Sequence, residues 1–294
     1  MERASWRSDA LGPARTLDLK QGSLRAHVTG EGPPVVFVHG VLVNANLWRK
    51  VVPRLDGLTR VTLDLPLGSH IDPMPAADLG PAGLADLIAD AIETLGLEDV
   101  TLVGNDTGGG LSQILVTRRP ERIGRLVLTS CDAFDNFPPR FFKIVLAPAQ
   151  IPGVIPVAFG GLRWRPLRRL PIAYGWLVNE QIDRDAEDSY VLPVLTRRDI
   201  RADVKRVLKG LDPRYTLEAA ERLRQFDKPA LIAWSREDRF FPPAHGERLA
   251  RTIPGARLEW IEGARTFSPE DFPERVAELI AGFARTRDTV AERV

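Results

Sequence analysis

The sequence predicts an α/β protein in which helices cover a mostly parallel sheet. Short runs rich in β-branched and apolar residues alternate with longer amphipathic stretches along the 294-residue chain. One run, PPVVFVHG at residues 33–40, is almost continuously apolar, as expected for a strand that is buried on both faces. The chain is long enough to bury a large core.

Eight runs are expected to form the strands. RTLDL and SLRAHVT look like an antiparallel pair that opens the sheet, and the later runs have the composition of buried parallel strands. In chain order the eight runs cover residues 15–19, 23–29, 33–40, 58–66, 99–105, 123–130, 228–235 and 256–262.

Helices are expected between these runs. In residues 83–95 the apolar side chains recur every three or four positions, which places them on one face of a helix. This stripe consists of Leu84, Leu87, Ile88, Ala91, Ile92 and Leu95. The other candidate helices are residues 46–55, 109–118, 244–252 and 273–285.

Residues 134–226 break the alternation. They contain no clear strand, are rich in Pro, Phe, Trp and Arg, and include helix-like pieces such as PRFFKIVLA and IRADVKRVLKGL. Because a structureless segment of roughly ninety residues is implausible inside a compact domain, we expect a helical insertion over the sheet. The predicted domains are a core of residues 1–133 and 227–294 and a helical cap of residues 134–226.

The composition is that of a globular protein without an obvious macromolecular partner. Forty basic residues against 39 acidic ones leave a net charge of +1, which favours neither nucleic acid nor acidic lipid. The basic stretch RWRPLRR, residues 163–169, is interpreted as a solvated helix face. No window reaches the ~20 apolar residues of a membrane helix, and the first residues lack the apolar core of a signal peptide. A cytoplasmic protein that binds no membrane is expected.

Metal and cofactor sites are not expected. The single cysteine, Cys131, excludes an intrachain disulfide and a cysteine-cluster metal site. The four histidines, His27, His39, His70 and His245, stand at no metal-ligand spacing. No feature of the sequence indicates an oligomeric state.

The stretch LVGNDTGGG, residues 102–110, places an aspartate at a sharp turn between a strand and a helix. In the related pattern G-x-S-x-G the central residue is a nucleophilic serine with positive φ, which requires small neighbours. Gly104, Gly108 and Gly109 supply those neighbours, and aspartate tolerates left-handed φ better than most residues. We therefore expect the Asp106 carboxylate to project from the sheet at the start of a helix, whose dipole favours negative charge.

These features resemble the α/β-hydrolase superfamily, and Asp106 resembles the nucleophile of its haloalkane dehalogenase and epoxide hydrolase branch. VHGVLVNANLW, residues 38–48, is similar to the His-Gly loop of that family, and AWSREDRFFP, residues 233–242, is similar to the loop that carries the catalytic acid. The resemblance covers residues 15–285 and implies an α/β-hydrolase fold with an eight-stranded, mostly parallel sheet, a helical cap and no cofactor.

The resemblance also implies roles for individual residues. Asp106 is the expected nucleophile, which would form an ester with the substrate, and Asp238 is the expected acid. Asp132 occupies a second position from which some relatives supply the acid. The backbone N–H groups of Val41 and Thr107 are expected to stabilise the oxyanion that forms when water attacks the ester.

One position departs from the family pattern. The family histidine is expected in a context like GxxHFxPED-P, but residues 263–273 read GARTFSPEDFP, so Thr266 takes its place. A threonine hydroxyl is not a useful base near pH 7, and loss of the general base alone lowers a rate by roughly 10²–10⁴. Alkylation of Asp106 could therefore proceed while hydrolysis of the ester is slow. Among the four histidines, only His70 is a candidate to reach the pocket in place of the family histidine.

The expected halide donors are missing as well. The dehalogenase branch usually has a tryptophan after the nucleophile and an asparagine after His-Gly, where this chain has Thr107 and Val41. Opening of an epoxide needs an acid over the ring oxygen, and among the cap tyrosines Tyr190 is favoured over Tyr174 and Tyr215.

The residues expected to contact substrate are His39, Val41, Asn44, Trp48, Thr107, Phe137 and Tyr190. A small to medium hydrophobic substrate is suggested by the aromatic residues of the cap, Phe137, Phe141, Phe142, Trp164 and Trp176.

Three functions remain open at this point. The first is a hydrolase of an epoxide, ester or halide with Asp106 as nucleophile and an incomplete triad. If Asp106, Asp132 and Asp238 share one cavity, their repulsion would raise at least one pKa and create an acid or base near neutrality. That arrangement suits the second function, a lyase, isomerase or cyclase with Asp106 as acid/base. The third is a ligand-binding pseudoenzyme. The hydrolase is ranked first.

Overall fold

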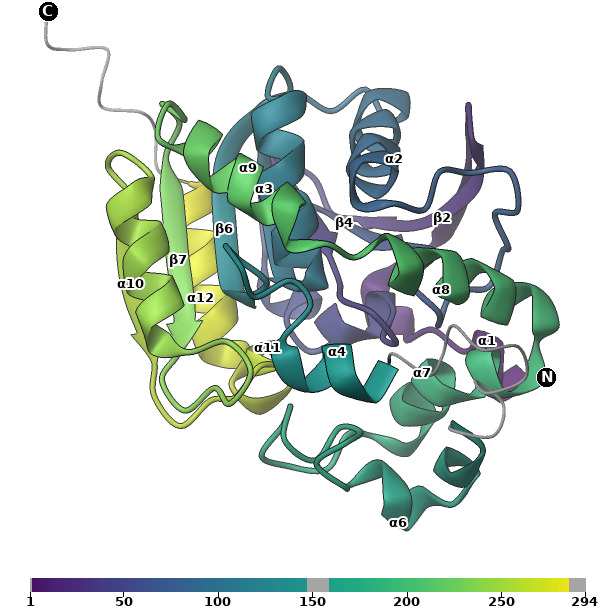
Figure 1. The fold of residues 1–294 in the computed structure, drawn as a ribbon. Coiled ribbons are helices and arrows are strands. Elements are labelled where there is room, and N and C mark those ends of the chain that lie inside the picture. The colour runs from purple at the N-terminus through teal and green to yellow at the C-terminus, as the bar shows by residue number, and fades with distance from the viewer. Residues whose placement is uncertain (1, 147–158, 286–294) are drawn as a thin grey trace, which may run out of the picture.

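The computed structural model describes residues 2–146 and 159–285, and one eight-stranded sheet lies at its centre (Figure 1). The strand order is β1-β2-β4-β3-β5-β6-β7-β8. β1 pairs antiparallel with β2 and β2 with β4, and all other neighbours are parallel, so the predicted sheet is confirmed. The strands are β1 Ala14–Leu19, β2 Gly22–Thr29, β3 Pro34–Val38, β4 Thr59–Asp64, β5 Val100–Asp106, β6 Ile123–Cys131, β7 Ala230–Ser235 and β8 Arg257–Ile261.

The chain reverses its direction of travel across the sheet at β3. From β3 it passes to β4 on one side and then returns to β5 on the other, and both strands are parallel to β3. In a parallel sheet a crevice opens beside the carboxyl ends of the strands where the order reverses. The loop after β3 and the end of β5, which carries Asp106, therefore meet at the usual place for a binding site.

Four of the five predicted core helices are present. The apolar stripe of α2 is buried, except that Leu95 follows the helix and is half-buried. The helix predicted at residues 46–55 is wrong, because Pro53 lacks the N–H that a helix interior needs and two short 3-10 helices form instead. The helices outside residues 134–226 are α1 Glu2–Ser5, η1 Asp9–Leu11, η2 Ala45–Trp48, η3 Val52–Arg54, α2 Pro81–Thr94, α3 Thr107–Arg118, α10 Pro243–Thr252, α11 Ser268–Asp271 and α12 Pro273–Ala284.

The described part of residues 134–226 consists of helices and turns and holds no strand. In Figure 1, α4, α6 and α7 lie beyond the end of the sheet to which the arrowhead of β7 points. α9 instead packs against α3, beside the sheet. The helices of this region are α4 Arg140–Leu146, η5 Gly161–Arg163, α6 Arg165–Arg168, α7 Arg184–Thr196, α8 Arg198–Gly210 and α9 Pro213–Leu223.

The basic stretch at residues 163–169 is only partly a solvated face. Arg163 and Arg169 are exposed, but Arg168 is buried and donates to Glu187 at 2.9 Å and to Asp188 at 2.7 Å, both on α7. The expectation of a solvated face is therefore wrong for Arg168. Arg168 can be buried because the two carboxylates pair with its positive charge, which would otherwise be costly to remove from water.

Candidate active site

Asp106 ends β5 and directly precedes α3 with φ 54° and ψ −131°. The predicted positive φ is thus confirmed, and such a conformation is strained for a residue with a side chain. The turn fits only because its neighbours are small. A Cβ on Gly104 would lie 2.6 Å from the Cα of Gly109, and one on Gly108 would lie 2.3 Å from the Val38 carbonyl oxygen.

Gly40 leaves room for the Asp106 carboxylate. A Cβ at Gly40 would lie 2.0 Å from Asp106 Oδ2, so Gly40→Ala must displace the carboxylate. Because a shift of about 1 Å in a reacting group can cost roughly 10²-fold, we expect covalent labelling of Asp106 to slow by about that factor, as followed by intact-protein mass spectrometry. Gly282→Ala, on α12, is the control, since a Cβ there meets nothing within 4 Å. Unchanged labelling in Gly40→Ala would contradict this placement.

Asp106 and Thr107 line a cavity of about 200 Å³ at the carboxyl ends of the strands. The side chains around it are apolar with three exceptions, Asp106, Thr107 and Tyr174. The Tyr174 hydroxyl donates to the Leu42 carbonyl oxygen at 2.7 Å, which ties the turn after α6 to the loop after β3. The other lining residues are Val41, Leu42, Pro138, Pro139, Phe142, Phe159, Leu162, Ile172, Ala173, Leu177, Leu208 and Leu211.

Two further carboxyl groups lie behind Asp106. Asp132 follows β6, where the neighbouring Cys131 pairs with Asp106, and neither carboxylate oxygen of Asp132 has a hydrogen-bond partner among the described residues. Asp238 lies after β7 and is 8% exposed. Its Oδ1 accepts from the backbone N–H groups of Phe240 and Phe241 at 2.8 and 2.9 Å, whereas its Oδ2 has no partner in the described part of the chain.

Burial raises the pKa of all three carboxyl groups, and repulsion by a neighbouring carboxylate adds to the shift for Asp106 and Asp132. Burial, opposed by the Thr107 backbone N–H and reinforced by the charge of Asp238, raises the pKa of Asp106 to about 7. Burial raises the pKa of Asp238 to about 6 against the hydrogen bonds from Phe241, Phe240 and Thr266. For Asp132, burial and the charge of Asp106 raise the pKa well above the usual range. The pKa rises as predicted, but burial rather than repulsion is the main cause, and only Asp106 of the three lines the cavity.

Thr266 lies beside Asp238. It is fully buried, and its hydroxyl donates to Asp238 Oδ1 at 3.0 Å. Its carbonyl oxygen accepts from the Asn105 side chain at 2.8 Å, so the segment that carries Thr266 is fastened beside the turn that carries Asp106. A histidine at this position would make the same kind of bond to Asp238 through its ring N–H.

No histidine is among the residues that line the cavity. His39 is buried beneath the loop, where Nδ1 lies 2.9 Å from the Gly40 carbonyl oxygen and Nε2 accepts from the Leu65 N–H. Burial lowers the pKa of His39 to about 4 and keeps it neutral. His70 lies 3.1 Å from Asp203 on α8, His27 bonds the Gly12 carbonyl oxygen, and His245 is half-buried on α10. The chance that His70 reaches the pocket is not realised.

Comparison with known proteins decides the family. Residues 35–279 match the alpha/beta hydrolase family. The chain belongs to this family. The uncharacterized hydrolase YugF of Bacillus subtilis is 28% identical over 260 residues, which cover 85% of this chain and 89% of YugF. A 2-hydroxy-6-oxononadienedioate/2-hydroxy-6-oxononatrienedioate hydrolase of Cupriavidus pinatubonensis is 28% identical over 261 residues, which cover 84% of this chain and 86% of the relative.

Solved structures agree with this assignment. Haloalkane dehalogenase DbeA from Bradyrhizobium elkani superposes with a TM-score of 0.77 over 92% of this chain and 97% of that one, at 18% identity. This similarity shows that the two chains share the α/β-hydrolase fold. Together with the family match and the hydrolase-named relatives, it makes the protein a hydrolase-like enzyme of the alpha/beta hydrolase family.

Of the residues expected to contact substrate in this alpha/beta hydrolase, only Val41 and Thr107 line the cavity. Five lie elsewhere, namely His39, Asn44, Trp48, Phe137 and Tyr190. Trp48 is buried against Phe37, with ring centroids 4.9 Å apart, and Phe137 is fully buried. The Tyr190 hydroxyl faces Glu270 at 3.5 Å. The structure does not support substrate contact for these five residues.

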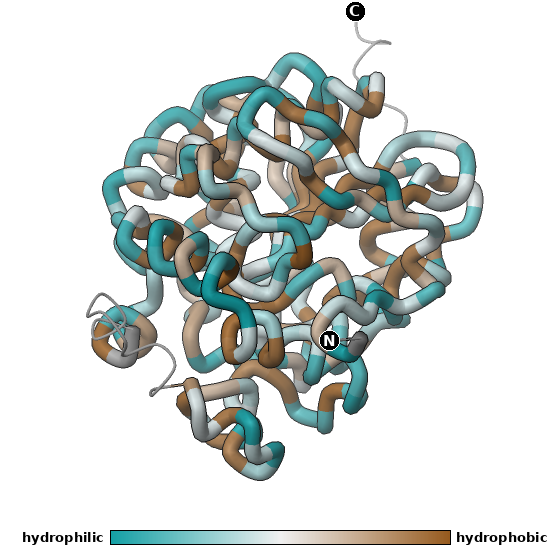
Figure 2. The backbone as a smooth tube through the Cα atoms, turned by 90° about the vertical axis from the view of Figure 1, so that its right-hand side faces the viewer, coloured by the Kyte–Doolittle hydropathy of each residue, from teal (hydrophilic) through white to brown (hydrophobic). Residues whose placement is uncertain are grey.

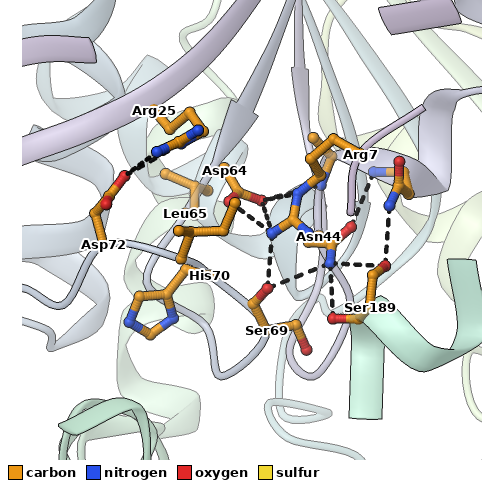
Figure 3. A network of polar contacts seen from close by, with 12 residues as sticks. Arg7, Arg25, Asn44, Asp64, Leu65, Ser69, His70, Asp72 and Ser189 are labelled. Atoms are coloured by element: carbon orange, nitrogen blue, oxygen red, sulfur yellow. Dashed lines mark hydrogen bonds and ion pairs between the residues drawn. The ribbon is translucent and has the colours of Figure 1, made fainter. Parts of the chain in front are cut away.

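Asn44 belongs to a buried polar network instead (Figure 3). Its side-chain amide donates to the carbonyl oxygens of Ser69 and Ser189, at 3.2 and 3.1 Å. Arg7 donates to the same Ser69 oxygen at 2.9 Å and pairs with Asp64 at 2.7 Å. The network therefore joins the N-terminal segment, the loops after β3 and β4, and α7, which holds the loop that supplies Val41 in place.

Tyr174, Leu42 and Phe142 line the cavity, although none of the three was among the residues expected to contact substrate. Tyr174 stood among the cap tyrosines, but no periodic pattern marked the direction of its side chain. No group of three His, Cys, Asp or Glu side chains in the described ranges could hold a metal ion. No described helix is long and apolar enough to cross a membrane.

Proposed function

We propose that this enzyme hydrolyses a small to medium apolar molecule with an electrophilic carbon, an epoxide, ester or halide, and that Asp106 is the nucleophile. The observation that carries the proposal is the strained turn that presents the Asp106 carboxyl group to an apolar cavity. Asp106 would attack the carbon as the bond to the ring oxygen or leaving group breaks. An epoxide or halide would leave an ester on Asp106, and an ester substrate would release its alcohol and leave an acid anhydride. Water would then cleave this intermediate and restore the carboxylate.

An epoxide ranks above a halide as the substrate. Val41 and Thr107 offer no side-chain donor of the kind that the dehalogenase pattern supplies for a halide. Tyr174 is the one tyrosine among the lining residues, so we assign to it, rather than to Tyr190, the proton that an opening ring oxygen would need. Its hydroxyl would have to turn away from the Leu42 carbonyl oxygen.

Asp238 is the proposed base for the second step. Its pKa of about 6 leaves it mostly ionised at pH 7, and its Oδ2 has no partner among the described residues. Asp238 is not among the residues that line the cavity, and therefore we expect it to reach the attacking water poorly and the ester to be cleaved slowly. The helical region 134–226, which supplies Phe142, Leu162 and Tyr174 to the cavity, is proposed as the cap.

A second candidate is a lyase, isomerase or cyclase in which Asp106 moves protons and forms no ester. It is favoured by the three buried carboxyl groups, one of which titrates near neutrality. Such an enzyme would convert substrate without incorporating oxygen from water and without an adduct. A ligand-binding protein would bind molecules in the cavity and leave them unchanged.

The test is incubation with epoxides, haloalkanes and activated esters, followed by intact-protein and peptide mass spectrometry. We expect an adduct on Asp106 whose rate of formation rises with pH through about 7, because the ionised carboxylate is the nucleophile and its pKa is raised from 3.8 to about 7. A rate that is level from pH 5 upward would contradict the raised pKa. Adducts confined to other residues, or no adduct with any compound of the panel, would overturn the assignment of Asp106 as the nucleophile.

A further inference from the structure

One stretch of the sequence has an unusual charge. Residues 136–179 contain no Asp or Glu and carry six Arg or Lys residues, although the whole chain has a net charge of only +1. The remainder of the chain is therefore net negative. The net charge of the whole chain suggested no attraction to acidic lipid, but it conceals this difference in charge between residues 136–179 and the rest. The six cations are Arg140, Lys143, Arg163, Arg165, Arg168 and Arg169.

Four of these cations have no acidic partner among the described residues, although Arg169 donates to the side-chain oxygen of Gln181. Arg165 and Arg168 are neutralised by Glu187 and Asp188 on α7. The other four, Arg140, Lys143, Arg163 and Arg169, are exposed, and none forms an ion pair with any described residue. An exposed cluster of one sign is a site of attraction for the opposite charge.

Large apolar side chains are exposed among these cations. Ile144 is 77% exposed, Trp164 66% and Ile172 52%, and Leu170 is 44% exposed. Only two other large hydrophobic residues in the described part of the chain are as exposed as 36%. Exposed apolar groups rimmed by charge mark an interaction surface. Figure 2 shows hydrophobic segments reaching the lower edge of the molecule.

The exposed residues flank the entrance of the active-site cavity. Ile172 itself lines the cavity, as do Phe142 on α4 and Leu162 on η5. α4 and the segment from η5 to Ile172 thus border the cavity and also carry the exposed apolar and basic side chains. We name the eight residues Arg140, Lys143, Ile144, Arg163, Trp164, Arg169, Leu170 and Ile172 the basic apolar rim.

We propose that the basic apolar rim docks on the surface of a membrane that contains anionic lipids. Arginine and lysine side chains would contact lipid phosphates, while Trp164 and Ile144 would enter the boundary between headgroups and acyl chains. The charge of the rim is complementary to an anionic leaflet. The rim consists of separate segments around the opening of the cavity. This arrangement suits contact with a planar surface, whereas a bound peptide would need a groove.

Docking would place the cavity mouth against the bilayer. An apolar substrate could then pass from lipid into the apolar cavity without crossing water, where its transfer is unfavourable. This inference does not depend on Asp106 or on the chemistry proposed for it. It concerns peripheral binding and requires no helix that spans the membrane.

The test is sedimentation of the full-length protein with vesicles of phosphatidylcholine, with and without phosphatidylglycerol. We expect binding only to the anionic vesicles, weakening as salt increases. Lys143→Glu combined with Arg163→Glu should lower the partition coefficient at least about tenfold, since each cation near an anionic surface contributes about fivefold. Trp164→Ala combined with Ile144→Ala should also weaken binding. Lys20→Glu and Leu217→Ala, which alter exposed residues outside the rim, should not.

A spectroscopic measurement locates the contact. Tryptophan emission should shift to shorter wavelength when anionic vesicles are added, and Trp164→Phe should remove the shift. Absence of vesicle binding overturns the proposal, as does binding that the charge reversals leave unchanged or that the control variants lower equally. Binding to a polyanion such as heparin without binding to vesicles overturns it in favour of an acidic macromolecule. Trp164-dependent self-association without vesicle binding assigns the rim to a second copy.

Discussion

Asp106→Asn is expected to abolish covalent labelling and to lower any product formation by about 10³-fold or more, because removing a nucleophile eliminates the step that it performs. The amide has nearly the shape of the carboxyl group, so it leaves the strained turn between β5 and α3 in place. Labelling is measured by mass spectrometry and product by chromatography, with the same panel of electrophiles as for the parent.

The stability of this variant provides its own control. The pKa of Asp106 is raised from 3.8 to about 7 in the folded protein, so the folded state binds the proton more tightly than the unfolded state. Stability that Asp106 contributes at low pH is therefore lost as the pH rises from about 4 through 7. Asp106→Asn cannot ionise, and we expect its Tm relative to the parent to be higher at pH 8 than at pH 4. A variant that is folded, and relatively more stable at pH 8, cannot owe its inactivity to unfolding.

Other outcomes would be equally informative. Product formation that survives in Asp106→Asn would show that Asp106 is neither nucleophile nor acid/base. A Tm difference that does not change between pH 4 and pH 8 would show that the carboxylate is not destabilised by its surroundings. Loss of product without any adduct in the parent would favour the lyase, isomerase or cyclase alternative.

The turn that carries Asp106 was predictable because its cause is local. Gly104, Gly108 and Gly109 permit the backbone to approach Val38 and Cys131, and few other reasons place small residues on both sides of one aspartate. The sheet was predictable for a similar reason, since a strand buried on both faces has to be apolar along its length, as β3 is. These features depend on neighbours in the sequence.

The residues that face the cavity were less predictable because tertiary packing decides their direction. Tyr174 and Tyr190 are both buried aromatic residues of the same region, yet Tyr174 reaches Leu42 over the cavity and Tyr190 turns to Glu270. Asn44 and Trp48 belong to a loop that does border the site. Their side chains nevertheless turn inward, because η2 is buried on all sides. An irregular segment has no periodic pattern from which the direction of a side chain could be predicted.

Thr266 is a third case, in which a residue singled out from the sequence lies beside another one, Asp238. The stretch GARTFSPEDFP drew attention to Thr266, and in the structure its hydroxyl donates to Asp238. The role of Thr266 could not be taken from the resemblance, because a threonine hydroxyl is not a useful base near pH 7. It has to be argued from the three carboxyl groups that remain.

Thr266→His is expected to accelerate cleavage of the Asp106 ester by roughly 10²–10⁴, the usual contribution of a general base. The imidazole would donate one ring N–H to Asp238, where the threonine hydroxyl donates at 3.0 Å, and would leave its other nitrogen free to take a proton from water. The variant is alkylated with an epoxide in a single turnover, and loss of the adduct is followed by intact-protein mass spectrometry. In water enriched with ¹⁸O, attack on the ester carbonyl would leave the label in Asp106.

Thr266→Asn is the matched control, because it also brings a larger polar side chain but no base. If both variants shed the adduct faster, the cause is access of water rather than proton transfer. If only Thr266→His does so, the missing imidazole limits the parent, and Asp238 is at most a slow substitute. If the parent already sheds its adduct as fast as Thr266→His, then Asp238 is a sufficient base, and its raised pKa of about 6 is the physical reason. Each result therefore identifies what limits the rate of ester cleavage.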